Sequence, residues 1–419
     1  MSVEQSNPIS SGDTHALPAT ATRRRGSGFW AVAFGFLIVM ASATLPSPLY
    51  GLYRERDHLS ALTITVIYAI FAAGTIAALG SVRYIAARAG RRNVMLGSVA
   101  TMMAAAGLLA AWKALPGLLI GRLITGVAVG LAAGTAITYL IELRARANPN
   151  ASPIRARNIG TAVNVGGLGL GPLIAGCLAE WAKWPLTLPY LIFVGLGAIA
   201  LFGLAAAPET GTRAPAAGRS RGTSRTVGLL VPGALATLTA FAANGLFAGL
   251  SGLLLAVTFG HSSHALSGAT LFLVFSAGVA SQLATNRMPP SRVLVLGTIS
   301  MLVGLALLVI SVHLSSPSLA LFLLSGALIG AGAGAMFKGT TGLVLEATAP
   351  ENRLEMTSDL LIALYVGLSI PVIGAGVALD RGATPPDTVL GFAIVVGLGV
   401  AGAGALLAHV LRRSLEKGT

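Results

Sequence analysis

Twelve apolar segments, each about 19 residues or longer, constrain the fold of this chain more than any other feature of its sequence. A helix of that length crosses the ~30 Å hydrocarbon core of a bilayer. Because lipid offers the backbone no hydrogen bonds, each crossing must be helical. Only 10% of the residues are charged, whereas a soluble protein carries roughly a quarter. We therefore expect an all-α membrane protein with helices at Phe29–Tyr53, Leu59–Val82, Asn93–Trp112, Leu118–Ile141, Gly160–Leu178, Leu188–Ala207, Val227–Phe259, Leu266–Thr285, Val293–Val312, Leu319–Phe337, Leu360–Leu379 and Thr388–Leu411.

The two halves of the sequence repeat one pattern of a basic loop, a glycine ladder and a proline. A duplicated set of membrane helices predicts two bundles facing each other across a pseudo-twofold axis, and a transported solute usually binds between such bundles. Glycines spaced four apart let helix backbones approach closely, so packing is the expected role of the ladder. Arg92, Leu96, Gly97, Gly126, Gly130 and Gly134 recur as Arg292, Leu296, Gly297, Gly326, Gly330 and Gly334, and Pro172 has a counterpart in Pro371, one residue off register.

The net charge of +14 reflects membrane topology rather than nucleic-acid binding. If the N-terminus is cytoplasmic, 22 of the 28 Lys and Arg residues fall in cytoplasmic segments and 5 in outer loops, with Arg122 inside the fourth apolar segment. This excess is a strong positive-inside signal, which predicts that both termini lie in the cytoplasm. The single cysteine, Cys177, allows no internal disulfide.

A polar break near the middle of the sequence divides the chain into two six-helix domains. The break is rich in Gly, Ala, Ser and Arg, a composition typical of a flexible linker. The first residues are rich in Ser, Thr and Pro, which favours disorder. The expected parts are a disordered cytoplasmic tail at 1–27, a bundle at 28–207, a cytoplasmic linker at 208–226, a second bundle at 227–411 and a cytoplasmic tail at 412–419.

The loop after the second expected helix carries the most specific motif. It spans Arg83–Arg92 and reads RYIAARAGRR, which resembles the G-x-L-A-D-R-x-G-R-R signature of the major facilitator superfamily. Two positions depart from that signature, because Arg83 stands in place of its first glycine and Ala87 in place of its aspartate.

Three further motifs follow in the order that this family shows. Arg122–Gly126 resembles the family's R-x-x-Q-G motif, with Thr125 in place of the glutamine. Gly167–Gly176 is similar to the G-x-x-x-G-P-x-x-x-G motif of the exporters in the family, and the sixth helix ends in the frequent family sequence Pro208-Glu209-Thr210. The resemblance implies the twelve-helix, two-bundle fold of the superfamily over the whole membrane region.

The resemblance also implies a function, that of bacterial exporters of the drug–proton antiporter type in the inner membrane. We expect proton-coupled efflux of small organic molecules by alternating access, with a small-molecule solute, protons and membrane lipids as partners. We expect no nucleic acid and no cofactor, and a monomer. Export rests on the fifth-helix motif alone, so an importer, as a proton symporter or a facilitator for a small metabolite, is the near alternative.

A non-transporting sensor and a membrane-embedded enzyme are the remote alternatives. An enzyme would need convergent nucleophiles, paired carboxylates or metal ligands inside the membrane. No apolar segment contains Asp, Glu or a pair of His, and His261 and His264 alone make a poor metal site. We therefore expect neither an enzyme nor a bound metal.

Five polar side chains are candidates for the solute or proton pathway. Arg122 is the strongest, because a guanidinium in a membrane segment is costly and usually faces a cavity or a partner, although it could also snorkel to the interface. Lys338 lines the path if the tenth helix continues past its apolar segment, and snorkels otherwise. Asn164, Asn244 and Tyr365 lie in mid-helix, where hydrogen bonding between helices is the default role. Asn244 and Tyr365 are preferred for solute contact, because the resemblance places their helices at the cavity.

The gating candidates cluster at the expected cytoplasmic side. In the family, the aspartate that this chain lacks contacts the start of helix eleven. We hypothesise an inverted latch, in which Arg88 or Arg91 pairs with Glu355 or Asp359, and the alternative is that the basic cluster only anchors the loop. Asp359 is also the first choice for the proton-coupling acid and Glu180 the second, since burial raises the pKa of a carboxyl. The remaining gating candidates are Gly90, Arg92, Gly171 and Pro172.

Overall fold

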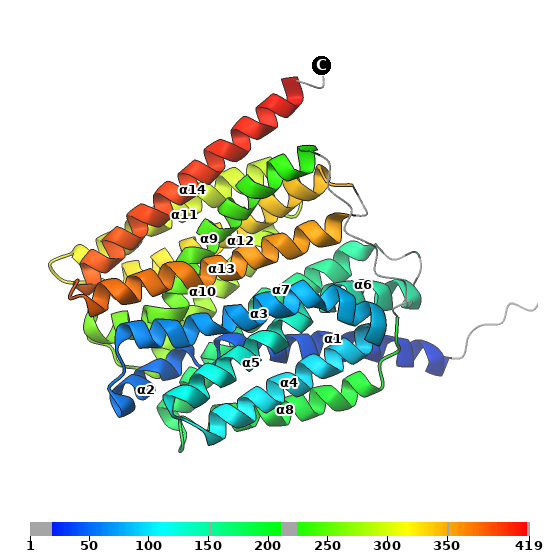
Figure 1. Cartoon of the computed structure of the whole chain (residues 1–419), viewed down its shortest axis with the longest axis horizontal. Helices are drawn as coiled ribbons and strands as arrows, with labels where there is room; N and C mark the ends of the chain where they lie inside the picture. Colours follow the sequence, from blue (N-terminus) through cyan, green and yellow to red (C-terminus); the bar gives the residue numbers. More distant parts are fainter. Residues whose placement is uncertain (1–18, 149, 151, 211–223, 350–351, 417–419) are drawn as a thin grey trace, which may run out of the picture.

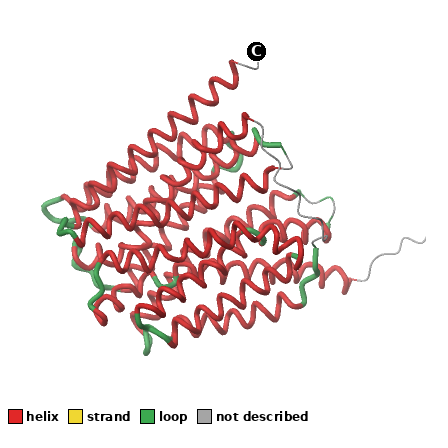
Figure 2. Tube along the Cα trace, in the orientation of Figure 1, coloured by secondary structure: helices red, strands yellow, loops and turns green. Residues whose placement is uncertain are grey.

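The computed structural model describes residues 19–148, 150, 152–210, 224–349 and 352–416, and every regular element in these ranges is helical (Figure 2). Twelve helical spans in them are long and apolar enough to cross a membrane, so the predicted multi-pass, all-α fold is confirmed. The elements are α1 (Ala19–Thr44), η1 (Ser47–Leu49), α2 (Tyr50–Asp57), α3 (Ala61–Ala89), α4 (Arg91–Ala111), α5 (Leu115–Ala133), α6 (Ala136–Ala147), α7 (Pro153–Trp181), α8 (Leu188–Ala205), α9 (Ser224–Val257), α10 (His264–Ala284), α11 (Pro290–His313), α12 (Leu319–Glu346), α13 (Arg353–Asp380) and α14 (Pro385–Glu416).

Helices α1–α8 form one bundle and α9–α14 a second, stacked side by side in Figure 1. In the first bundle α1 packs on α7, α3 on α5, and α4 on both α5 and α8. In the second bundle α9 packs on α13, α10 on α12, and α11 on both α12 and α14. The two sets of pairs correspond helix by helix, so the duplication read from the sequence is a duplication of packing.

The glycine ladder brings helix backbones into direct contact at the same place in both bundles. A Cβ atom at Gly126 of α5 would overlap the carbonyl oxygen of Phe71 in α3. A Cβ atom at Gly330 of α12 would overlap the carbonyl oxygen of Val274 in α10. Only glycine permits this approach, so the expected packing role of the ladder is confirmed.

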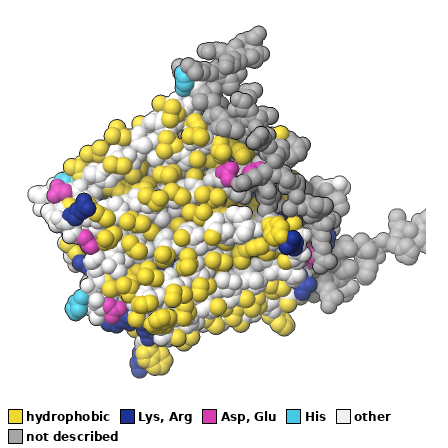
Figure 3. All heavy atoms as spheres, viewed as in Figure 1, with side chains coloured by type: hydrophobic (Ala, Val, Ile, Leu, Met, Phe, Trp, Pro, Cys, Tyr) yellow, Lys and Arg dark blue, Asp and Glu magenta, His cyan; other side chains and the backbone are white. Residues whose placement is uncertain are grey.

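Charged side chains gather at the two ends of the bundles and leave an apolar belt between them (Figure 3). The connections α3–α4, α6–α7, α10–α11 and α12–α13 lie at one end, together with the start of α1 and the end of α14 (Figure 1). We call this the basic end, because most of the arginines of the sequence lie at these connections, at the start of α1 or at the end of α14. The other end, with the connections α7–α8, α9–α10 and α13–α14, is called the opposite end.

Several boundaries differ from the prediction. Helix α1 begins at Ala19 and α14 continues to Glu416, so part of each expected tail is helical. These stretches contain Ala, Arg and Leu, which favour continued helix once a span has nucleated it. Residues 1–18 of the expected tail at 1–27, and residues 211–223 of the expected linker at 208–226, lie outside the described residues.

The first and fourth spans each contain a break in the helix. The first breaks at Pro46 and Pro48, which lack the N–H groups that would continue α1, and resumes through η1 into α2. The fourth breaks after Gly134, between α5 and α6. Both breaks are local, since the spans Gly28–Asp57 and Leu115–Ala147 each remain one crossing.

Candidate functional site

The two bundles meet along two seams, where α7 packs on α10 and α3 packs on α13. The first seam is so close that a Cβ at Gly268 of α10 would overlap the carbonyl oxygen of Pro172 in α7. The second brings Gly376 of α13 against the Thr65 hydroxyl of α3. Both contacts lie in the half of the bundle nearer the opposite end. Of the two gating candidates on α7, Pro172 therefore lies at a seam, whereas Gly171 packs on Ala41 of α1 within its own bundle.

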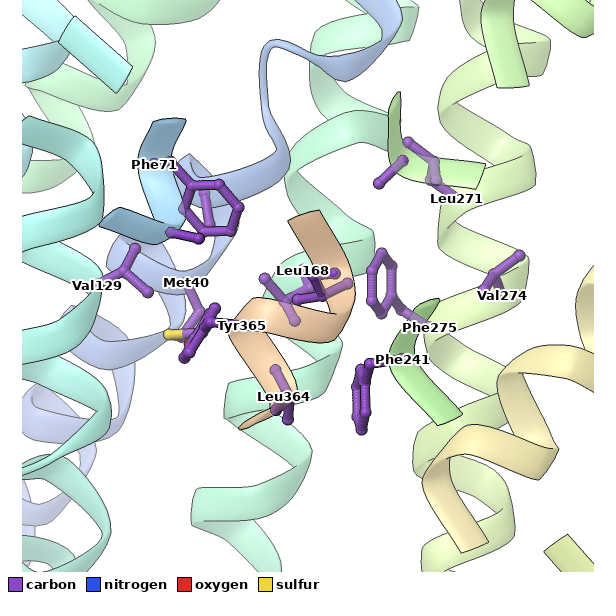
Figure 4. Packing of buried hydrophobic residues seen from close by; sticks show 14 of the residues in the cluster. Met40, Phe71, Val129, Leu168, Phe241, Leu271, Val274, Phe275, Leu364 and Tyr365 are labelled. Carbon is purple, nitrogen blue, oxygen red and sulfur yellow. The ribbon is translucent and has the colours of Figure 1, made fainter. Parts of the chain in front are cut away.

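Between the seams, buried apolar side chains from both bundles form one layer, which we call the central layer. Figure 4 shows several of them projecting into the same region from helices of both bundles. Phe71 of α3 and Tyr365 of α13 meet edge to face across the second seam, with ring centroids 5.9 Å apart. The layer contains Met40, Phe71, Leu168, Phe241, Phe275, Leu364 and Tyr365, all of them buried.

A few polar atoms in or next to the central layer are buried and have no hydrogen-bond partner among the described residues. They include the side-chain oxygen of Asn244 in α9, the hydroxyl of Tyr68 in α3 and the hydroxyl of Ser369 in α13. Asn244 adjoins Gly245, which packs on Leu368 of α13. Buried polar groups are normally satisfied, so unsatisfied ones next to an apolar layer are sites where a solute can supply the missing hydrogen bond.

Arg122 of α5 is fully buried and binds backbone rather than a carboxylate. Its guanidinium donates hydrogen bonds to the carbonyl oxygens of Ala43 (2.5 Å) at the end of α1, and of Ile67 (3.4 Å) and Tyr68 (3.2 Å) in α3. The carbonyl of Ala43 belongs to the last turn of a helix, where such groups lack partners. Arg122 therefore joins α1, α3 and α5, and the snorkelling interpretation is wrong because the side chain has 0% exposure.

The same guanidinium contacts the central layer through an aromatic ring. The Arg122 Cζ atom lies 4.6 Å from the ring centroid of Phe71, a distance typical of a cation–π contact. Phe71 in turn meets Tyr365 of the other bundle. A row of three side chains thus connects the buried charge of the first bundle to the second bundle.

At the basic end, the loop between α3 and α4 is tied to the end of α8. The Glu209 carboxylate accepts hydrogen bonds from the backbone N–H groups of Arg91 (3.0 Å) and Arg92 (3.1 Å), which open α4. Gly90 has φ +84°, and a Cβ there would lie 2.5 Å from a Glu209 carboxylate oxygen. The Arg92 side chain donates to the carbonyl of Ala205 in α8 (2.6 Å). Gly90 and Arg92 therefore stabilise the first bundle from within.

The other charged gating candidates also occupy the basic end. Arg91 binds Glu142 of α6, with Nε–Oε2 2.8 Å, and the Arg88 guanidinium stacks on Tyr84, 4.0 Å from its ring centroid. Glu355 lies in the first turn of α13 and Asp359 in the next, half-buried. The proposed latch between these arginines and acids stays a prediction for a conformation closed at the basic end.

Two pathway candidates lie away from the central layer. Lys338 sits within α12, which does continue to Glu346, but its ammonium donates to the carbonyl of Gln282 (2.5 Å) and the side chain of Asn286 (2.8 Å) at the end of α10. A cation there complements the negative end of a helix dipole. Asn164 is half-buried on α7, about one turn from Leu168 toward the basic end.

Sequence reasoning did not single out two side chains that the structure places at the site. Tyr68 and Phe71 are buried next to Arg122, yet in the sequence they are two aromatic residues in an apolar segment. No local signal separates them from packing residues. Tyr68 and Phe71 are spaced by about one helical turn and lie opposite the break in α1. Only the packing of α5 against α3 shows that both rings face Arg122.

Comparison with known proteins agrees with this architecture. The family model of the Major Facilitator Superfamily matches residues 32–353. The fold is similar to that of a D-xylose-proton symporter, with a TM-score of 0.72, 18% identity, and coverage of 92% of this chain and 97% of that one. It is also similar to a mutant form of the nucleoside transporter NupG, with a TM-score of 0.68, 13% identity, and coverage of 91% of this chain and 99% of that one. No curated protein sequence matches the chain significantly.

Proposed function

Because the chain belongs to the major facilitator superfamily, we propose that it takes up a small, uncharged organic solute by alternating access, coupled to protons. Family membership makes it a transporter rather than an enzyme. The central layer supports the solute class, since it is apolar, is built by both bundles and borders unsatisfied polar atoms of Asn244 and Tyr68. A solute with a hydrophobic body and a few hydroxyl or amide groups complements such a surface.

The nature of the surrounding charge argues against strongly cationic solutes. Arg122 is the buried charge next to the central layer, and the acids of the described spans lie at helix ends. A polycation would have to leave water without a carboxylate to receive it, which costs several kcal/mol per charge or more. Neutral solutes avoid this cost.

Uptake replaces the expectation of drug export. Export rested on the resemblance of Gly167–Gly176 to an exporter motif, and the glycines of this segment act as packing contacts to α1 and α10. Such contacts serve a transporter of either direction. The similarity of fold to a D-xylose-proton symporter supports uptake as the direction of transport.

The described conformation fits one half of an alternating-access cycle. The positive-inside rule assigns the basic end to the cytoplasm. Contacts across both seams then lie on the outer side, at Pro172–Gly268 and Thr65–Gly376, which corresponds to a state closed to the outside.

Binding of neutral solutes to the purified protein tests the solute class. We would measure thermal stabilisation by nucleosides, pentoses and a neutral amphipathic dye, and follow any hit by uptake into proteoliposomes. Substitution N244L should abolish stabilisation by the hit, because it removes the unsatisfied amide. The matched control N93L alters an exposed asparagine at the basic end, whose side chain donates to the carbonyl of Ala89 at the end of α3, and should retain the stabilisation. Equal stabilisation of N244L and wild type would contradict the assignment, and stabilisation by the dye alone would favour export.

Proton coupling is tested at Asp359, which lies half-buried on the same helix as Tyr365. Substitution D359N should remove the dependence of uptake on an imposed ΔpH, because the side chain can no longer gain or lose a proton. Exchange of labelled for unlabelled solute, which needs no net proton movement, should persist. Unchanged ΔpH dependence in D359N would exclude Asp359, and no ΔpH dependence in the wild type would indicate a facilitator.

A further inference from the structure

Two carboxylates at the opposite end each cross from one bundle to the other and bind the first turn of a helix. The first is Glu180, at the end of α7. It accepts hydrogen bonds from the backbone N–H groups of His264 (2.7 Å) and Ala265 (3.3 Å) and from the hydroxyl of Ser263 (3.1 Å), at the start of α10. All of these partners belong to the second bundle.

The second carboxylate is Asp380, the last residue of α13. It accepts a hydrogen bond from the backbone N–H of Leu62 (3.2 Å), in the first turn of α3. This contact runs in the opposite direction, from the second bundle to the first. Each seam is therefore closed at this end by a carboxylate of one helix on the N-terminus of the other.

The partner groups are suited to hold an anion. The first N–H groups of a helix have no partner within it, and they carry the positive end of the helix dipole. At both helices a serine caps a neighbouring N–H: Ser60 accepts from Thr63, and Ser263 accepts from Leu266. The carboxylates take donors that the caps leave free.

The two contacts are related by the internal duplication. Helices α7 and α13 are the fifth spans of their bundles, and α3 and α10 are the second spans. Glu180 and Asp380 stand 200 positions apart, the same offset that separates Gly126 from Gly326. A chance surface contact would not be expected to recur at the symmetry-related position with a carboxylate again as acceptor.

We propose that Glu180 and Asp380 are a symmetric pair of latches that hold the bundles together at the opposite end. The pair sets the balance between the closed and open states of this gate. The proposal rests on the alternating-access cycle proposed above. Both carboxylates are exposed and screened by solvent, so each contributes modestly. Because one rigid-body movement would break both, their effects combine.

Accessibility of buried positions next to each latch reports the opening of the gate. Ser267 of α10, beside the first seam, is 3% exposed, and Thr65 of α3, at the second, is 0% exposed. We would introduce S267C or T65C into a C177S background and reconstitute the protein in nanodiscs, where a maleimide reaches both ends. The rate of labelling then measures how often each seam opens, whichever way the protein is oriented.

The latch variants E180A and D380A should each raise the labelling rate about two- to fivefold, the range expected for losing one anion at a helix N-terminus. Each variant should raise the labelling rate at both reporters. In the double variant E180A/D380A, the fold-increases of the two single variants should multiply. The isosteric variants E180Q and D380N should show a smaller rise in the same direction. The matched control D387A removes an acid at the same end that lies in the first turn of α14 and bonds to Thr384, just before that helix, and it should label at the wild-type rate.

Three results would overturn the latch. The first is a wild-type labelling rate in both E180A and D380A, and the second is an equal rise in the labelling rate of D387A. The third is a rise confined to the reporter nearer the substitution, which would indicate local fraying. Failure of the proposed function would give a different result. Reporters that never react with the maleimide in any variant, even when nucleosides or pentoses are added, would show that the gate does not open. Thermal unfolding of each variant separates loss of fold from loss of the latch.

Discussion

At Arg122, a guanidinium with 0% exposure donates to carbonyl oxygens of α1 and α3 and lies against the ring of Phe71. A cation in this place costs desolvation energy, and backbone carbonyls with an aromatic face supply the compensation. The side chain holds together the helix break in α1, the second span and the fourth span. Its role in the described conformation is therefore to position the helices that carry one side of the central layer.

Substitution R122M tests this positioning role. Methionine fills most of the volume but leaves the Ala43 carbonyl without a donor, so we expect a loss of about 1–3 kcal/mol in unfolding free energy. R122K keeps the charge but cannot donate from a planar group to three acceptors, so its unfolding free energy should lie between those of the wild type and R122M. Thermal unfolding in detergent measures both. An R122M protein as stable as wild type would exclude a structural role and leave Arg122 to solute or proton contact.

At the scale of helices, close backbone contact organises each bundle. At Gly126 the backbone of α5 packs directly on α3, and at Gly330 the backbone of α12 packs directly on α10. The basic end adds a different device, since Glu209 caps α4 and ties it to the end of α8. Packing within a bundle is thus extensive, which suits bundles that move as rigid bodies.

Substitutions in the glycine ladder should separate contact positions from open ones. G126A and G330A place a Cβ on a neighbouring backbone carbonyl, so we expect each to lose about 1–3 kcal/mol of stability. The control G107A lies in α4 with no atom within 4 Å of the added Cβ, and alanine favours helix there. We would compare thermal unfolding of the three variants. Equal stability of G330A and G107A would show that the backbone contact of α12 with α10 is absent.

At the scale of the whole molecule, two bundles share a central layer and two seams, and the charged residues separate into two ends. In the alternating-access cycle proposed above, this arrangement would let one end close while the other opens, provided that each bundle stays intact. Which membrane face each end meets decides whether the described state faces inward or outward.

Labelling of single cysteines in intact cells determines this orientation. In a C177S background, we expect S262C, in the loop between α9 and α10, to react with an impermeant maleimide added outside. N150C, between α6 and α7, should react only after the membrane is permeabilised, because its flanking arginines favour the cytoplasm. Both positions are exposed, so burial does not limit the reaction. The reverse pattern would invert the assignment of ends.

The twelve spans, the duplication and the segregation of charge could be predicted from the sequence, because lipid forces apolar helices and each of these properties is local or periodic. The sequence also indicated Asn244 and Tyr365 as positions near the shared layer, through the resemblance of their helices. The partners of Arg122, the capping of α4 by Glu209 and the contacts of Glu180 and Asp380 with the other bundle became visible only in the folded molecule. These contacts join residues far apart in the chain, and they depend on the rotation and depth of whole helices, which no local pattern of apolar residues specifies.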